Sequence, residues 1–390
     1  MRFSHFATVA LALPLAACGG KTDDPAVDSG AACGLCVDAS VDAPLVDGGV
    51  DAPRDTPTDA TADATTDVGA DVPSGPGAVP PPRPSTTATG GTTKWFVMKR
   101  LYLGLTDRDS SVSSPSAWKQ YGFDLDHRTT TAADSASSSG TCKRVSGSPS
   151  GVLEDGALGR DNSFGAHFMQ TLKSLKSDIE DSVNSGLVGG TETMLFRLDN
   201  VAGDDNASVP GAIYRTGSLS TPPRFDGSDR YPVDDASVTG SDLTKPVHTF
   251  ASGYMAGGVW VSGDSGVGTF DFPLVFVGAP ISLSLKGAVV VFRVSTGKEG
   301  TFAGLVTDSD FRGALTSAFE SFGVCPGSST FDAVVHSGTD ASDLVAGAPD
   351  FQDTAKTCDS ISLGVGFDVA PAMAPTSIVP TTPTPPSTCP

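Results

Sequence analysis

The chain has 390 residues, and its 25 lysines and arginines stand against 45 aspartates and glutamates, which gives a formal net charge of −20. So acidic a chain repels the phosphates of nucleic acids and of anionic lipids, and both are excluded as expected partners. The partners that this charge favours are cations, neutral glycans and basic proteins.

The N-terminus has the pattern of an export signal. Arg2 gives a basic start, and the apolar run from Phe6 to Leu13 is shorter than the roughly 20 residues that a membrane-spanning helix needs. The next residues, Leu15-Ala16-Ala17-Cys18, resemble the lipobox of bacterial lipoproteins. The resemblance implies that residues 1–17 are a signal peptide and that Cys18 carries more than one acyl chain, which is a stable membrane anchor.

The residues after Cys18 indicate the membrane in which the protein is expected. Gly19 and Gly20 follow it, so the aspartate that retains some members of that family in the inner membrane is absent. By this rule we expect a lipid-anchored protein of the outer membrane, facing the periplasm or the cell surface. The alternative is a signal peptide cut elsewhere, with Cys18 an ordinary half-cystine.

Residues 18–93 are predicted to be a disordered linker. Proline and like charge oppose a long helix here, and charge repulsion and proline extend such a chain. The repeating aspartates, one in every four residues, are Asp47, Asp51, Asp55, Asp59, Asp63, Asp67 and Asp71. Cys33 and Cys36 within it are interpreted as a local or intermolecular disulfide.

At Lys94 the composition changes, and residues 94–370 are predicted to form a β-rich globular domain. Dense or alternating apolar residues, separated by glycine, proline, asparagine and aspartate, indicate strands. The predicted strands are 95–105, 193–198, 212–216, 254–262, 268–277, 281–285, 288–295, 301–307 and 360–369. We also expect a short strand at 123–126, with Asp124 and Asp126 on one face.

Two segments have helical spacing. Phe164, Phe168, Leu172, Leu175, Ile179 and Val183 form one apolar stripe over residues 163–185, with Asp161 or Asn162 as the N-cap and Gly186 as the terminator. A second helix is predicted over 308–323. The fold class is therefore mainly β, a β-sandwich or jelly-roll-like domain with two added helices, in one domain or in two subdomains divided near residues 204–210. Residues 371–390 form a Pro/Thr-rich tail.

Four cysteines of the domain and tail, Cys142, Cys325, Cys358 and Cys389, are an even number in an exported chain and predict two disulfides. The favoured pairing is Cys325 with Cys358, which closes the shorter loop, and Cys142 with Cys389.

An acidic constellation is the strongest candidate for a metal site. Asp124, Asp126, Asp155 and Asp161 offer oxygen ligands of the kind that Ca²⁺ takes. The start of the predicted helix over residues 163–185 could lie near the carboxylates of Asp124 and Asp126. The alternative is that these residues only form turns and cap the helix.

Catalytic motifs are weak. Gly263-Asp264-Ser265-Gly266 resembles the nucleophile motif of chymotrypsin-like proteases over four residues, but neither His127 nor His167 has that family's context. Asp124, Asp126, Glu154 or Asp155 could supply the paired carboxylates of a glycan hydrolase. Four aromatic residues could stack on sugar rings, or they could be buried in the core: Trp95, Trp118, Tyr121 and Trp260.

The Asp-rich tether, residues 118–126 and 155–165, and the C-terminal stretch from Cys358 to Phe367 resemble uncharacterised predicted lipoproteins of myxobacterial type. This resemblance implies no activity. We therefore expect a non-catalytic binding or structural module, anchored to the membrane, that contacts a glycan or an envelope protein; the alternative is an anchored glycan hydrolase.

We predict that Cys18→Ser releases the protein from the membrane fraction, because the acylated thiol is the expected anchor. Fractionation with and without detergent measures this. A Cys18→Ser protein that still needs detergent for extraction would refute lipidation at this residue.

Overall fold

The computed structural model describes residues 77–108, 110–137, 140–263, 269–276, 279–321, 323–383, 386–387 and 389. The predicted signal peptide and lipidated Cys18, Cys33 and Cys36, and most of the predicted linker lie outside these residues. So do Asp264, Ser265 and Gly266 of the protease-like motif.

The described domain is mainly β, as predicted, and ten strands form one antiparallel sheet. These strands are β1 (Thr92–Tyr102), β3 (Met194–Val201), β4 (Gly211–Arg215), β6 (His248–Phe250), β7 (Tyr254–Ala256), β8 (Val259–Val261), β9 (Thr269–Phe276), β10 (Ala279–Arg293), β11 (Gly300–Thr307) and β13 (Ser360–Pro371). The order across the sheet is β6-β4-β3-β1-β13-β11-β10-β8-β7, and β9 also pairs with β10.

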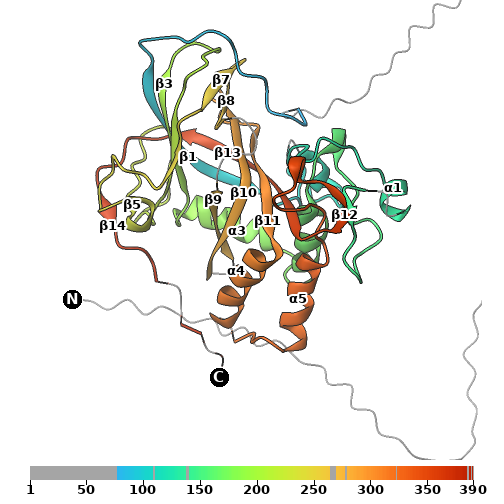
Figure 1. Cartoon of the computed structure of the whole chain (residues 1–390). Coiled ribbons are helices and arrows are strands. Elements are labelled where there is room, and N and C mark those ends of the chain that lie inside the picture. The colour runs from blue at the N-terminus through green and yellow to red at the C-terminus, as the bar shows by residue number, and fades with distance from the viewer. Residues whose placement is uncertain are drawn as a thin grey trace, which may run out of the picture. The chain divides into compact units, whose positions relative to one another are not determined.

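Two parallel strand pairs flank this sheet (Figure 1). They are β2 (Cys142–Lys143) with β12 (Asp353–Thr357), and β5 (Val233–Asp234) with β14 (Ile378–Val379).

Most predicted strands are present, with two changes at glycines. The predicted strand over 254–262 is a hairpin, because Gly257 and Gly258 both have positive φ angles, 55° and 77°, and turn the chain between β7 and β8. The predicted strands 281–285 and 288–295 are one long strand, β10, whose pairing with β11 shifts register between Lys286 and Val289. This is the irregularity of a β-bulge.

The sheet is strongly curled. Phe196 on β3 and Phe292 on β10 have ring centroids 5.4 Å apart, although three strands separate β3 from β10. In a flat sheet with neighbouring strands about 4.8 Å apart, the two strands would lie roughly 19 Å apart. Phe250 on the edge strand β6 contacts Trp260 on β8, the strand next to the opposite edge, with centroids 5.9 Å apart. The curl therefore wraps the sheet around an aromatic core, where a β-sandwich would stack two sheets.

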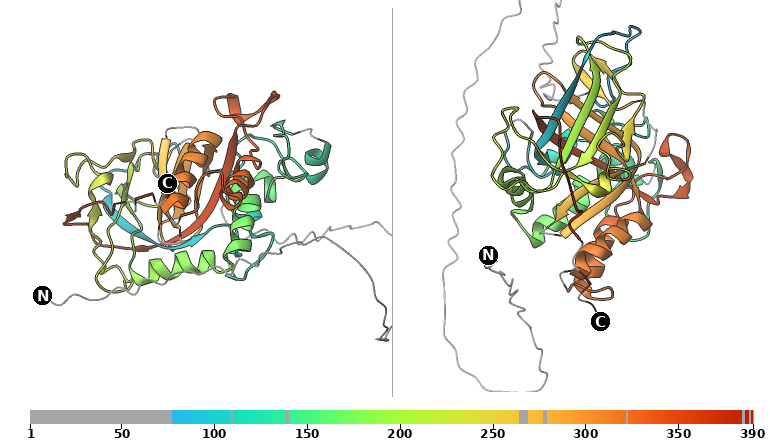
Figure 2. Two further views of the ribbon diagram at one scale, coloured as in Figure 1. Left: turned by 90° about the horizontal axis from the view of Figure 1, so that it is seen from below. Right: turned by 90° about the vertical axis from the view of Figure 1, so that its left-hand side faces the viewer.

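Five α-helices are described, and α3, α4 and α5 pack against strands of the sheet (Figure 2). They are α1 (Ala132–Ser137), α2 (Met169–Leu175), α3 (Ile179–Gly189), α4 (Asp308–Ser321) and α5 (Ser329–Thr339). The predicted helix 308–323 corresponds to α4. The predicted helix 163–185 is a π-helical turn over Phe164–Phe168 followed by α2 and α3, because the chain is extended at Lys176. α3 continues past Gly186 and ends at Gly190, which is left-handed.

Residues on both sides of the predicted domain pack against it. Residues 77–91, which the sequence analysis assigned to the linker, lie on the domain: Arg83 donates to the carbonyl oxygens of Ala207 and Ser252 at 2.7 and 2.6 Å. In the predicted tail, β14 pairs with β5.

Two disulfides are present, but the predicted pairing was wrong. Cys142 bonds Cys358, and Cys325 bonds Cys389. The parallel pairing of β2 with β12 places Cys142 beside the residue that follows β12, so strand pairing decides the partner and loop length does not. The Cys325–Cys389 bond fastens the tail to the domain.

We predict that peptide mapping of the non-reduced protein finds peptides that join Cys142 to Cys358 and Cys325 to Cys389. The Cys142→Ser/Cys358→Ser variant should lose about 2–5 kcal/mol of stability in urea unfolding, because this bond closes a loop with a sequence separation of 216. A linked peptide that joins Cys325 to Cys358 would contradict the described fold.

Candidate carboxylate site

The segment that carries Asp124 and Asp126 lies directly against β13, because glycines there leave room for it. A Cβ added at Gly364 would lie 2.6 Å from the Cα of Gly122, far inside normal contact. Gly122 has φ +100°, which favours glycine. The carbonyl oxygen of Phe123 then accepts the N–H of Asp161 at 2.9 Å. Residues 121–126 and the start of the first long helical segment are thereby joined.

This contact brings three of the four predicted carboxylates together. One oxygen from each of Asp124, Asp126 and Asp161 lies within 4.8 Å of the others. Asp126 and Asp161 are buried, with 0% and 2% of their surfaces exposed, while Asp124 is partly exposed. The expectation that the helix start approaches Asp124 and Asp126 therefore agrees with the structure.

The local structure around Asp124 and Asp126 is a turn, so the prediction of a strand at 123–126 was wrong. The N–H of Arg128 donates to Oδ1 of Asp124 at 3.1 Å and to Oδ1 of Asp126 at 2.9 Å. Such carboxylate to backbone bonds favour turns over strands. The hydroxyl of Thr141, next to Cys142, also donates to Asp126.

Asp161 is not a helix cap. Its Oδ2 accepts the N–H of Leu125 at 2.6 Å, across to the other segment. Asn162 has the capping role instead, since its Oδ1 accepts the N–H of Gly165 at 3.0 Å. Capping therefore does not account for Asp161.

Asp155 lies close to the same charges. Its Oδ2 accepts the N–H of Thr130 at 2.5 Å. Burial raises its pKa, and the charges of Asp126, Asp343 and Asp124 raise it further. Its own charge adds to the effect of burial on the pKa of Asp161. All four predicted residues are thus electrostatic neighbours, although only three place oxygens within one small sphere.

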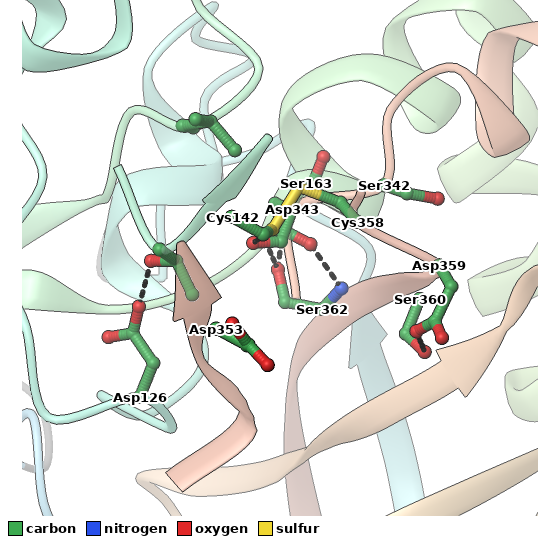
Figure 3. The surroundings of a disulfide bond; sticks show 12 residues. Asp126, Cys142, Ser163, Ser342, Asp343, Asp353, Cys358, Asp359, Ser360 and Ser362 are labelled. Atoms are coloured by element: carbon green, nitrogen blue, oxygen red, sulfur yellow. Dashed lines mark hydrogen bonds between the residues drawn. A yellow bond between two sulfur atoms is a disulfide. The ribbon is translucent and has the colours of Figure 1, made fainter. Parts of the chain in front are cut away.

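A fifth carboxylate, Asp343, was missed. It follows α5, a helix that the sequence did not predict, and it accepts the N–H and the hydroxyl of Ser362 at 2.7 and 2.5 Å. Figure 3 shows Asp126 and Asp343 among the residues that surround the Cys142–Cys358 disulfide. A lone aspartate between a helix and a loop carries no pattern that could have identified it. We call Asp124, Asp126, Asp155, Asp161 and Asp343 the carboxylate cluster.

Burial is the main cause of unusual titration in the cluster. It raises the pKa of Asp343 to about 7, with a further contribution from the charge of Asp126. Burial and the neighbouring carboxylates raise the pKa of Asp155 to about 8 and that of Asp161 well above its ordinary value. The pKa values of Asp124 and Asp126 are also raised, again mainly by burial.

The charge of Arg128 lowers the pKa of Asp126, but burial has the larger effect and the pKa of this carboxyl is raised. Buried carboxylates that lie this close together are stable only when they are protonated, paired with a cationic side chain or bound to a metal cation. Three carboxylates with oxygens so close together suit a hard cation such as Ca²⁺, which prefers oxygen ligands.

The arrangement is less suited to glycan hydrolysis. Such an enzyme needs two carboxyl groups that flank a bond in a cleft. Glu154 forms an ion pair with Lys119 at 2.7 Å, and Asp126 has no exposed surface. Of the aromatic candidates, Tyr121 and Trp260 are fully buried and Trp118 is 8% exposed, so these three belong to the core.

Searches against protein-family models, curated proteins and solved structures found no match to this chain. None of the helices in the described part of the chain has the length and apolar character needed to cross a membrane.

We predict that Asp343 makes the protein less stable as the pH rises, when a chelator is present. Its pKa is 3.8 in an exposed reference and about 7 when folded, so the folded state binds the proton more tightly. The stability from this proton is complete below about pH 4 and is lost as the pH rises through about 7. Asp343→Asn should therefore gain stability relative to the parent between pH 5 and pH 8, on the order of 2–4 kcal/mol in urea unfolding.

The matched control is Asp226→Asn, because Asp226 is exposed and hydrogen-bonded to Ser228. Its stability relative to the parent should not change over this pH interval. An Asp343→Asn variant with the same flat response would show that this carboxyl is not protonated in the folded state.

Proposed function

We propose that the protein is a non-catalytic binding or structural module, anchored by lipid at Cys18 to the outer membrane, and that a divalent cation, Ca²⁺, stabilises it through the carboxylate cluster. The lipobox-like Leu15-Ala16-Ala17-Cys18 supports the anchor. The two disulfides support an oxidising compartment outside the cytoplasm.

One observation supports the proposal most directly: the acidic side chains that could have served in catalysis are buried and hydrogen-bonded to the backbone. Asp126 and Asp161 accept hydrogen bonds from the backbone, and both are buried. Two described cavities, of about 860 and 290 Å³, are lined by other residues. A carboxylate pair that holds two chain segments together is suited to stabilising a fold, whereas a glycosidase pair must reach substrate.

The proposed cation would hold together three segments of the chain. The cluster joins residues 121–126, the Asp155–Asp161 loop and the segment after α5, which are distant in sequence. At neutral pH, ionisation of several of these carboxyls would repel the segments from one another. A bound Ca²⁺ would keep the carboxylates ionised and replace that repulsion by attraction. Asp124, Asp126 and Asp161 would hold it.

We predict that Ca²⁺ raises the melting temperature at pH 7.5 compared with a chelator. At a calcium concentration one hundred times the dissociation constant, the gain is about 2.7 kcal/mol, or roughly 5 °C for a domain of this size. Asp126→Asn should remove the shift, because the isosteric amide keeps the volume and loses the charge. Thermal unfolding followed by circular dichroism measures both.

Asp124→Asn is the second variant, since Asp124 is partly exposed and its replacement disturbs the core least. Asp226→Asn, on the exposed loop, should keep the full calcium response. Equal melting temperatures of the parent protein in calcium and in chelator would reject the cation, and the cluster would then be held by shared protons alone.

A further inference from the structure

A large cavity lies on the helical side of the sheet, separate from the carboxylate cluster. Its volume is about 860 Å³, and none of the cluster residues lines it. Its walls come from α3, from α4, from the sheet strands β1, β3 and β10, and from tail residues Thr381 and Thr382. Protein interiors are close-packed, and a hollow of this size falls in the range of small-molecule sites.

Small side chains on α3 and α4 leave room for the cavity. On α3 these are Ser182 and Gly186, and on α4 they are Gly313, Ala314 and Ser317. A Cβ added at Gly313 would meet nothing within 4 Å. Glycine in the middle of a helix costs about 1 kcal/mol relative to alanine, so the chain keeps this hollow at some expense of helix stability.

The walls are fixed in place. Asn184 on α3 makes two hydrogen bonds to the backbone of Leu101 on β1, both 2.8 Å long. On the tail side, Thr381 donates to Asp234 at 2.5 Å, and Cys389 is bonded to Cys325 beyond α4. A cavity with braced walls is preorganised for a ligand, which reduces the entropy lost on binding.

The floor of the cavity is apolar. Met98, Leu101 and Met194 come from the sheet, and Ile179 and Leu187 from α3, and all five are buried. Serine and threonine hydroxyls surround this floor, among them Ser282, Ser284 and Thr191. Such a lining matches a ligand with an apolar body and a few hydrogen-bonding groups.

The charged side chains of the lining have partners within the protein. The pairs are Lys176 with Asp178 at 2.7 Å, Arg215 with Asp234 at 2.6 Å, Asp310 with Lys286 at 3.3 Å, and Glu192 with the hydroxyl of Thr382. The two cations of the lining are thus neutralised, while the carboxylate of Glu192 would repel an anion. This charge distribution disfavours an anionic ligand.

We infer that the cavity between α3, α4 and the sheet binds an uncharged amphiphile, an apolar molecule with a few hydroxyl or carbonyl groups. The inference is independent of the cation, because the cavity and the carboxylate cluster share no residue.

The test uses the full mature chain with Cys18→Ser, so that no detergent is needed. The uncharged fluorescent probe N-phenyl-1-naphthylamine should bind at one saturable site, and the anionic 1-anilinonaphthalene-8-sulfonate should bind at least tenfold more weakly. Gly313→Leu fills the hollow and should weaken the uncharged probe at least tenfold. Its melting temperature should be equal or higher, because leucine replaces glycine in a helix.

The matched control is Gly189→Leu. Gly189 is an exposed glycine on α3 with open space around it, and it does not line the cavity. This variant should bind the probe as the parent does. A parent chain that binds no probe, or a folded Gly313→Leu variant with unchanged affinity, would overturn the site. Equal affinity for the anionic probe would overturn the ligand class.

Discussion

The contact between the backbones of Gly122 and Gly364 is the one on which the candidate site depends. β13 lies in the middle of the sheet, with eleven of its twelve residues buried, and its glycines admit a second chain segment at van der Waals distance. Asn162 reinforces this contact, since its Oδ1 accepts the N–H of Gly364 at 3.0 Å. Any side chain at residue 364 would push residues 121–126 outward and separate Asp124 and Asp126 from Asp161.

Close packing at this point concentrates negative charge, and the surrounding structure is arranged to hold it. Asp124, Asp126 and Asp161 place oxygens within 4.8 Å of one another, and Asp155 and Asp343 lie near enough for their charges to act on Asp161. The Cys142–Cys358 disulfide joins β2 covalently to the residues that precede β13. The carboxylate cluster and the cavity between α3, α4 and the sheet have no residue in common. The side of the carboxylate cluster is tightly packed and polar, whereas the side of α3 and α4 retains a preformed apolar hollow.

Much of the sheet could be predicted from the sequence, because an apolar run such as residues 301–307 indicates a strand that is buried in the core. The curl could not, since it depends on contacts such as Phe196 with Phe292 between strands that are not neighbours. α5 was missed because threonine, valine and glycine in Ser329–Thr339 are poor helix formers and tertiary packing overrides them.

The same distinction holds for the candidate site. The residue types were accessible from the sequence. The approach of Asp161 to Asp124 and Asp126 was also expected, but from a strand at 123–126 that the structure does not have, and the contact between Gly122 and Gly364 places these residues instead. The pairing of Cys142 and the presence of Asp343 were not, because both follow from strand and loop placement.

The central claim is that the carboxylate cluster holds a cation. A crystal structure of the mature chain grown with Ca²⁺ at neutral pH, with anomalous diffraction recorded, tests it most directly. We expect one anomalous peak per chain, with oxygens of Asp124, Asp126 and Asp161 at about 2.3–2.6 Å, the usual calcium–oxygen distance. No peak, with carboxyl oxygens in direct contact through shared protons, would contradict it.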